Sequence, residues 1–151
     1  MPKPYRVSAG GIVFVDSKML LVRYENLDGS TLLAGPGGAL ERGENAIQAI
    51  RRETREETGI VVQPSKVIFI EDLENDRYKM CKIWMLCEYV GGQITQTPEA
   101  DQEGIIACGW FTREDLHSET VFPPEMIEHE WSEFTDETWQ AQVLPSRFAV
   151  F

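Results

Sequence analysis

Three glutamates at helical spacing are the residues of this sequence best placed to do chemistry. Glu53, Glu56 and Glu57 lie three and four positions apart within residues 45–58, a segment whose pattern predicts a helix, so they share one face. At about 100° per residue, Glu53 and Glu57 point the same way as an apolar stripe. Buried carboxylates without a cation are costly or become protonated, so the arrangement predicts a hard divalent cation, Mg²⁺ or Mn²⁺. The stripe consists of Ala46, Ala49 and Ile50.

A solvated acidic patch is the alternative interpretation of the same charges. Runs of charge are commonly exposed, and Arg52 and Glu56 have the i,i+4 spacing of a surface ion pair. The outward face of the predicted helix, however, carries polar residues of its own, namely Gln48, Arg51 and Arg55. Glu53 and Glu57 fall on the opposite side, which favours the metal site.

A glycine-rich segment, residues 35–38, precedes this helix by a short distance. Gly37 and Gly38 allow the backbone to approach a ligand or a metal closely, because no Cβ intervenes. Such a run is poorly tolerated in a helix or a central strand, so we expect a loop that helps to bind substrate.

The glycines and the carboxylates together resemble the Nudix box of the Nudix hydrolase superfamily, G-x5-E-x7-R-E-U-x-E-E-x-G-U, in which U is a bulky aliphatic residue. In this sequence Gly38 is followed after five residues by Glu44 and after seven more by Arg52, and residues 52–60 read RETREETGI. Every charged and glycine position matches. Thr54 replaces the usual aliphatic residue, and because its methyl group can still pack we expect a small effect on stability.

The resemblance implies a hydrolase that cleaves a P–O–P bond in a nucleoside diphosphate linked to another moiety, using Mg²⁺ or Mn²⁺. Substrates of this class are nucleoside triphosphates, ADP-ribose, nucleotide sugars and dinucleoside polyphosphates. A nucleotide sensor or protein-interaction module with the same fold, without hydrolysis, is the alternative. Such proteins usually lose box glutamates, and all of them are present here.

The resemblance also implies a role for each box residue. Glu56 and Glu57 are expected to bind the metal, and Glu53 to be a further ligand or the base that positions water. Arg52 is expected to hold the carboxylates by ion pairing, with Glu44 as its partner or as a support for the loop. The carbonyl oxygen of Gly37 is a further expected metal ligand.

Residues outside the box are candidates for completing the site. Relatives often recruit another carboxylate from a later loop, for which Glu103 is the first choice and Glu99 the second, although an ordinary acidic surface loop fits equally well. Tyr78 lies where dinucleoside-polyphosphate hydrolases of the family often carry a tyrosine. Arg6 and Arg23 are the arginines that we expect to bind phosphate. Other cations that could do so are Arg77, Lys79 and Lys82.

The elements that position these residues form an α+β pattern without strict βαβ alternation. Asn45 can cap the helix together with Gln48, and Gly59 can end it. A C-terminal helix is expected after Pro123-Pro124, from the spacing of Ile127, Trp131, Phe134 and Thr138. The resemblance implies an α/β/α sandwich around a mixed β-sheet, in a single domain over residues 1–151. Strands are predicted at residues 5–15, 18–24, 31–33, 67–73, 78–90 and 105–111.

Composition excludes several other functions. With 25 acidic against 14 basic residues, the net charge of −11 disfavours binding to nucleic-acid polymers or to anionic membranes. The three cysteines, without a C-x-x-C pair, predict free thiols in a reducing cytoplasm. No secretory signal is evident, so we expect a cytoplasmic enzyme with a small nucleotide substrate, as a monomer or homodimer.

Overall fold

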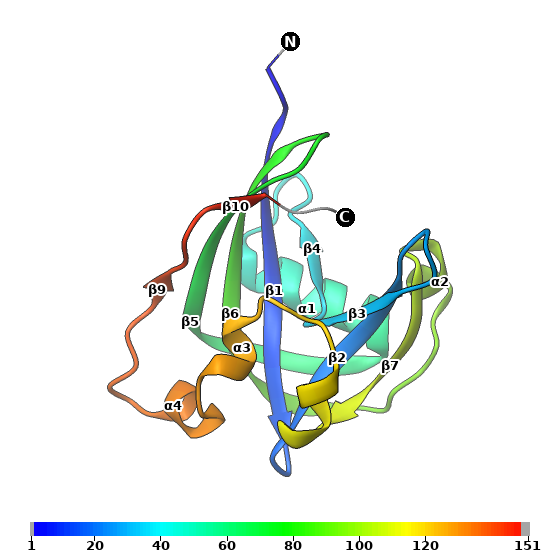
Figure 1. The fold of residues 1–151 in the computed structure, drawn as a ribbon. Coiled ribbons are helices and arrows are strands. Elements are labelled where there is room, and N and C mark those ends of the chain that lie inside the picture. Colours follow the sequence, from blue (N-terminus) through cyan, green and yellow to red (C-terminus); the bar gives the residue numbers. More distant parts are fainter. Residues whose placement is uncertain (1, 149–151) are drawn as a thin grey trace.

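Strand β1 (Tyr5–Val15) lies at the centre of a mixed sheet (Figure 1). In the computed structural model, which describes residues 2–148, β1 runs parallel to β6 (Lys79–Gly92) and antiparallel to β2 (Lys18–Glu25). Strand β5 (Ile60–Glu74) pairs antiparallel with β6. The predicted α+β class with a mixed sheet is therefore confirmed.

Six shorter strands complete the sheet, whose order is β10-β5-β6-β1-β2-β3-β8. Off this path, β4 pairs with β1, β7 with β2 and β9 with β5. The short strands are β3 (Thr31–Ala34), β4 (Gly37–Ala39), β7 (Ile105–Phe111), β8 (Val121–Phe122), β9 (Gln142–Val143) and β10 (Arg147–Phe148).

Alternation along the strands creates two cores, one on each side of the sheet. Val13 and Met85 pack toward helix α1 (Ala46–Thr58). Their neighbours Ile12 and Trp84 belong to the opposite core, which the C-terminal segment covers. This segment contains the 3₁₀ helix η1 (Glu114–Ser118) and the helices α3 (Glu125–Glu128) and α4 (Trp131–Thr135). Helices on both sides of the sheet give the predicted α/β/α arrangement (Figure 1).

Helix α1 has the ends that the sequence predicts. The side chain of Asn45 accepts a hydrogen bond from the backbone N–H of Gln48 at 2.9 Å, and the Asn45 N–H donates to the Gln48 side chain at the same distance. Gly59 ends the helix in the left-handed region with φ of 81°. The two caps fix where the helix begins and ends, and thereby the height of its carboxylates above the sheet.

Two expectations are wrong in detail. Gly37 and Gly38 lie in a strand, β4, rather than in a loop. A Cβ at Gly37 would lie 2.4 Å from the carbonyl oxygen of Ala9, so glycine is what allows β4 to pair so closely with β1. The expected C-terminal helix is two short helices, because the chain is extended at His129 and Glu130 between them.

Hydrophobic contacts explain why the C-terminal pattern looked like one helix. Phe134 is buried and Ile127 and Trp131 pack against the same core, so the apolar spacing is satisfied although the helix is interrupted. The indole N–H of Trp131 donates to the carbonyl oxygen of Met126 at 2.8 Å, which bridges the break. Thr138 follows α4 and bonds instead to Asp136.

The remaining general expectations concern cysteines and membranes. Cys81, Cys87 and Cys108 are all free thiols. Within residues 2–148, no helix has the length and apolar character needed to cross a bilayer.

Candidate active site

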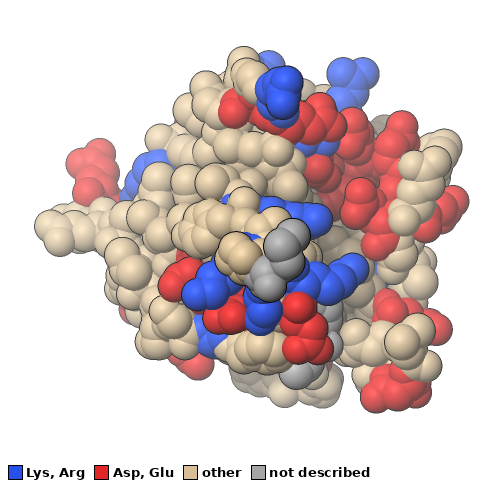
Figure 2. Space-filling model, turned by 90° about the horizontal axis from the view of Figure 1, so that it is seen from above, with Lys and Arg blue, Asp and Glu red and all other residues tan. Residues whose placement is uncertain are grey.

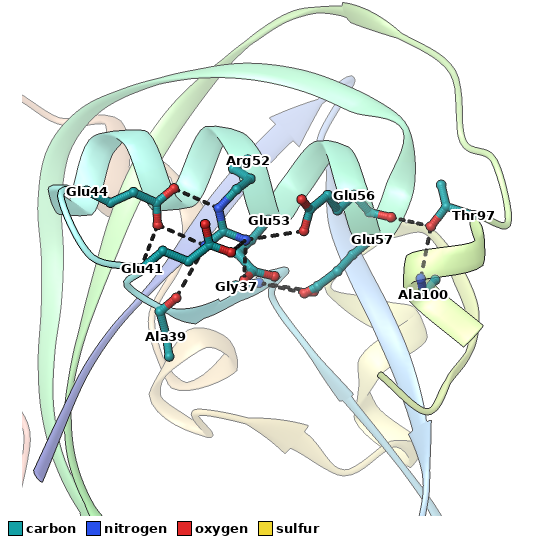
Figure 3. Close-up of polar contacts among 10 residues, drawn as sticks. All are labelled: Gly37, Ala39, Glu41, Glu44, Arg52, Glu53, Glu56, Glu57, Thr97 and Ala100. Carbon is teal, nitrogen blue, oxygen red and sulfur yellow. Dashed lines mark hydrogen bonds and ion pairs between the residues drawn. The ribbon is translucent and has the colours of Figure 1, made fainter. Parts of the chain in front are cut away.

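The guanidinium of Arg52 connects three of the predicted acidic residues (Figure 3). Its Nε and Nη2 donate to the two carboxylate oxygens of Glu44 at 2.7 and 2.9 Å. Its Nη1 donates to Glu53 at 2.9 Å and to Glu56 at 3.2 Å. A further bond, from Nη2 to the carbonyl oxygen of Ala39 at 3.3 Å, attaches this network to β4. Arg52 therefore orients the carboxylates of the helix relative to the strand.

Glu57 is buried against the backbone of β4. Glu57 is only 1% exposed, and its Oε1 accepts a hydrogen bond from the N–H of Gly37 at 3.1 Å. The Gly37 amide thus binds a carboxylate, while the proposed metal-binding group of Gly37 is its carbonyl oxygen. The inward orientation inferred for Glu53 and Glu57 is what the structure has, since both are buried and Glu56 is only partly so.

Gly38 is in van der Waals contact range of Glu53. A Cβ at Gly38 would lie 2.7–3.1 Å from the three carboxyl atoms of Glu53, closer than such atoms approach one another. The first glycine of the box therefore leaves the space that the first glutamate of the helix occupies, which gives a physical reason for their fixed separation along the chain.

The buried carboxyls retain an electrostatic conflict. Burial raises the pKa of Glu57 to about 8, an effect that the Gly37 N–H opposes and the nearby charge of Glu53 reinforces. Burial also raises the pKa of Glu53, against the lowering effect of Arg52. These shifts mean that the protein's own groups do not fully compensate the two negative charges.

This conflict fits a hard divalent cation. The donor atoms are carboxylate oxygens, which are the ligands that Mg²⁺ and Mn²⁺ prefer. Within residues 2–148, no three His, Cys, Asp or Glu side chains converge tightly enough to form a ready-made metal centre. The Arg52 guanidinium binds Glu53 and Glu56, so their carboxylates would have to turn toward a cation that bound beside Glu57.

A cleft of about 1240 Å³ opens beside these residues. Glu53 and Gly38 line one part of it, and Glu103 and Tyr24 line it as well. Burial is the main cause that raises the pKa of Tyr24, and the charges of Glu57, Glu103 and Glu53 raise it further. The structure thus brings Glu103, the first-choice outer carboxylate, to the same cleft as Glu53.

Glu99 lies on a different surface. With Glu56 and Arg55 it lines a hollow of about 610 Å³ on the outward side of α1. The segment that carries both candidate carboxylates is a short helix with the residue after it rather than the expected loop, and it is joined to α1, because the hydroxyl of Thr97 donates to the carbonyl oxygen of Glu56 (Figure 3). The same hydroxyl accepts from the N–H of Ala100 at 3.0 Å and so caps helix α2 (Pro98–Gln102).

Of the predicted substrate-binding residues, some line the cleft and one does not. Arg6 and Tyr78 line the cleft, and the Arg6 guanidinium lies 4.2 Å from the centre of the Tyr78 ring. Arg23 is not brought to the cleft. It forms a bidentate ion pair with Glu119, at 2.8 and 3.0 Å, and donates a hydrogen bond to the Thr31 hydroxyl, so its donors are used outside the cleft.

Lys82 is one of the further cations that the sequence offers for phosphate binding, and the structure brings it to the cleft. It lies on β6 and lines the cleft, and it is within electrostatic range of Glu57, Glu71 and Glu53. Burial lowers its pKa, and these carboxylates oppose that effect. Seen from above, acidic side chains gather over one area of the surface, and acidic and basic side chains are interspersed over another (Figure 2). The strand pattern indicates the orientation of Lys82, because Lys82 and the buried Trp84 are two residues apart and therefore point to the same face of the sheet.

The sequence matches the profile of the NUDIX domain over residues 4–134. That span covers most of the chain, and the chain belongs to the Nudix family. The expectation drawn from the box is confirmed at the level of the family.

Named relatives show which proteins resemble this chain. Phosphatase NudJ of Escherichia coli K12 is 32% identical over 117 residues, or 77% of this chain and 73% of that protein. An ADP-ribose pyrophosphatase of Methanocaldococcus jannaschii is 28% identical over 98 residues, or 64% of this chain and 58% of its own length. The 8-oxo-dGDP phosphatase NUDT18 of Danio rerio is 33% identical over 81 residues, 54% of this chain but only 24% of its length.

Solved structures share the fold. A UDP-X diphosphatase superposes with a TM-score of 0.70 at 23% identity, over 94% of this chain and 68% of that one. A Nudix hydrolase of Nitrosomonas europaea gives a TM-score of 0.69 at 24% identity, over 83% and 85%. These similarities confirm the Nudix fold.

Proposed function

We propose that this chain is a divalent-metal-dependent pyrophosphohydrolase that cleaves the P–O–P bond of a nucleoside diphosphate linked to another moiety. The observation that carries the proposal is the pair of buried carboxyls, Glu53 and Glu57, whose pKa values are raised by burial and of which Glu53 lines a large cleft. Membership of the Nudix family supports it, as does the presence of every box glutamate.

Glu53, Glu56 and Glu57 would hold the metal, with the Gly37 carbonyl oxygen as a further ligand. A divalent ion at this position supplies charge neutralisation at the phosphate oxygens and makes a water molecule a better nucleophile at neutral pH. Mg²⁺ is the expected ion, and Mn²⁺ has similar ligand preferences.

The other side chains of the site orient these groups. Arg52 binds Glu53 and Glu56 and so sets the position from which their carboxylates would turn to a metal, and its two bonds to Glu44 fix the guanidinium plane. Glu103, on the cleft side, is placed to accept a proton from an attacking water or to bind a second ion.

The size and lining of the cleft support a nucleotide carrying a second group. A volume of about 1240 Å³ exceeds what a drug-sized ligand commonly needs. Arg6 and Tyr78 provide a cation and an aromatic surface away from the carboxylates. Two of the named relatives act, by their names, on ADP-ribose or 8-oxo-dGDP, so ADP-ribose, nucleoside di- and triphosphates, nucleotide sugars and dinucleoside polyphosphates form the panel to test.

The chain's organisation supports one Nudix domain in a reducing compartment such as the cytoplasm. Strand β10, near the end of the described residues, pairs with the middle of the chain at Leu73 and Glu74. The three cysteines are unpaired.

A substrate panel with Mg²⁺, analysed by product mass, tests the proposal. Turnover should appear with Mg²⁺ or Mn²⁺ and disappear in EDTA. Glu57→Gln should lower turnover by at least ~10²-fold, because it removes a charged ligand while its amide oxygen can still accept the Gly37 N–H. Glu137→Gln, at an exposed position, is the control and should match wild type.

Two results would contradict the proposal. Full turnover by a metal-stripped sample would exclude the metal-dependent mechanism. Nucleotide binding without any product, across the whole panel, would instead identify a Nudix-fold sensor.

A further inference from the structure

The ammonium group of Lys82 occupies an unusual position on the floor of the cleft. Lys82 faces Glu71 across the β5–β6 pair and Ser8 across the β6–β1 pair, so it sits in the middle of the sheet. Lys82 lies on the same sheet face as Trp84, opposite the face that packs on α1; Trp84 is buried in the core on this face, and Lys82 lines the cleft. A lysine at such a central position is uncommon without a dedicated partner.

The partner is an aromatic ring rather than a hydrogen-bond acceptor. The Lys82 Nζ lies 4.4 Å from the centre of the Trp84 ring, a cation–π distance. Among residues 2–148, Lys82 has neither a hydrogen bond nor an ion pair within bonding distance. Its N–H donors therefore remain available to a ligand in the cleft.

The Trp84 ring is itself fixed. Its indole N–H donates to Oε2 of the buried Glu71 at 3.0 Å. Gly10 and Gly35 border the ring so closely that a Cβ at either would come within 2.3 and 2.7 Å of it. These contacts fix the Trp84 ring, which therefore keeps the Lys82 ammonium in one position before any ligand binds.

The charges around Lys82 indicate what that ligand carries. Lys82 lines the same cleft as Glu53, and its ammonium is within electrostatic range of Glu57, Glu71 and Glu53, two of which are the carboxylates proposed to bind the metal. A group that binds there must suit a divalent cation and an ammonium at once. The oxygens of a diphosphate do so, because they are negative, numerous and able to accept several hydrogen bonds.

We propose that Lys82, held on the Trp84 ring, binds the diphosphate oxygens of the substrate from the floor of the cleft, opposite the carboxylates of α1. The inference rests on the proposed function and assigns Lys82 to binding of the diphosphate that is cleaved. Methylenediphosphonate, a diphosphate mimic whose P–C–P bond cannot be hydrolysed, isolates this contact from recognition of the base or of the second moiety.

The experiment is calorimetric titration of methylenediphosphonate with Mg²⁺ into wild type, Lys82→Met, Lys82→Arg and Lys79→Met. Lys82→Met should raise Kd at least ~10-fold, and Lys82→Arg, which keeps the charge, should raise it less. Lys79→Met is the matched control, because Lys79 lies on the same strand, is exposed and does not line the cleft; its Kd should equal that of wild type. An unchanged Kd for Lys82→Met, or no binding to wild type, would overturn the inference.

A second measurement needs no variant and guards against a misfolded Lys82→Met protein. The chain has five lysines, so their ¹³Cε resonances can be resolved and assigned in wild type. Adding methylenediphosphonate with Mg²⁺ should shift the Lys82 resonance most. A shift confined to other lysines would make Lys82 a structural counter-ion of Glu57 and Glu71.

The two proposals can fail separately. A protein that hydrolyses nucleotides although Lys82→Met keeps its affinity for the mimic would refute only the role of Lys82. A protein that binds the mimic through Lys82 but converts no substrate of the panel would refute only the proposed hydrolysis.

Discussion

The position of the Glu53 carboxylate is determined by two residues on different elements. Arg52, its neighbour in α1, holds one oxygen by a hydrogen bond of 2.9 Å. Gly38, on β4, lies against the same carboxylate, and a Cβ there would be 2.7 Å from the oxygen that Arg52 binds. Since a shift of even 1 Å in a catalytic group can lower turnover strongly, both contacts should matter for activity more than for stability.

Gly38→Ala tests this separation of activity from stability. The added Cβ would meet the end of the flexible Glu53 side chain, which can swing away at little cost in free energy. Turnover should fall at least ~10-fold, while the melting temperature should change by only a few degrees. Gly91→Ala, where a Cβ meets nothing within 4 Å, is the control and should leave both unchanged.

Gly37→Ala provides the contrast. Its Cβ would meet the backbone oxygen of Ala9, which cannot move without breaking the β1–β4 pair. This variant should therefore lose stability as well as activity. Wild-type turnover in Gly38→Ala would show that the observed position of Glu53 is not required.

Glu99 lies in helix α2 and Glu103 directly follows that helix, yet the two glutamates face different surfaces, and this difference is testable. Glu103 lines the cleft with Glu53, whereas Glu99 lies beside the outward arginines of α1. Glu103→Gln should reduce kcat at least ~10-fold, because its charge acts on the reacting end of the site, and Glu99→Gln should stay within about twofold of wild type. Steady-state kinetics on the best substrate of the panel gives both values. Equal, small effects would place the additional carboxylate elsewhere.

At the scale of elements, helix α1 was predictable and the cleft was not. The helix carries its own signals along the sequence, in the Asn45 cap, the apolar stripe and Gly59. Its half of the site follows directly, because the glutamates share that helix. The partners Lys82 and Glu71 are brought together only by the pairing of β5 with β6, a long-range register that no local pattern specifies.

Alternation along β2 would have corrected one expectation. Tyr24 lines the cleft, so its neighbour Arg23 must point to the other face of the strand, where it pairs with Glu119. The strand at Gly37-Gly38 could not be foreseen, because glycines are weak strand formers and β4 exists through its pairing with β1. Local alternation therefore accounts for Arg23, whereas at β4 tertiary contact overrides local preference.

The capping box at Asn45 should stabilise the whole domain without contributing to chemistry. Asn45→Ala leaves the N–H of Gln48 without its acceptor and should lower the free energy of unfolding by about 1 kcal/mol. Urea denaturation with an unchanged m-value measures this loss, and Gln140→Ala, at an exposed position, is the control. Turnover at 25 °C should stay within about twofold of wild type. A larger loss of turnover than of stability would show that the helix start also positions the glutamates.

At the scale of the molecule, the net charge of −11 adds to the repulsion among the site carboxylates. Burial raises the pKa of Glu57 from an ordinary 4.5 to about 8 in the metal-free protein. Between these two pH values the folded protein keeps a proton that the unfolded chain has released. Folding therefore binds protons, and the free energy of unfolding should fall as pH rises through this interval. Burial raises the pKa values of Glu53 and Glu71 too, so they act in the same direction.

Thermal unfolding of wild type and Glu57→Gln between pH 5 and pH 9 tests this linkage, because other titrating groups contribute equally to both proteins. In EDTA, wild type should lose stability relative to Glu57→Gln as pH rises toward about 8, since only wild type must ionise a buried carboxyl there. With saturating Mg²⁺, the rise in melting temperature should grow with pH in wild type, because the cation displaces that proton, and should be small in Glu57→Gln at every pH. Parallel curves for the two proteins in EDTA, together with equal Mg²⁺ shifts, would mean that Glu57 neither carries the buried proton nor binds the metal.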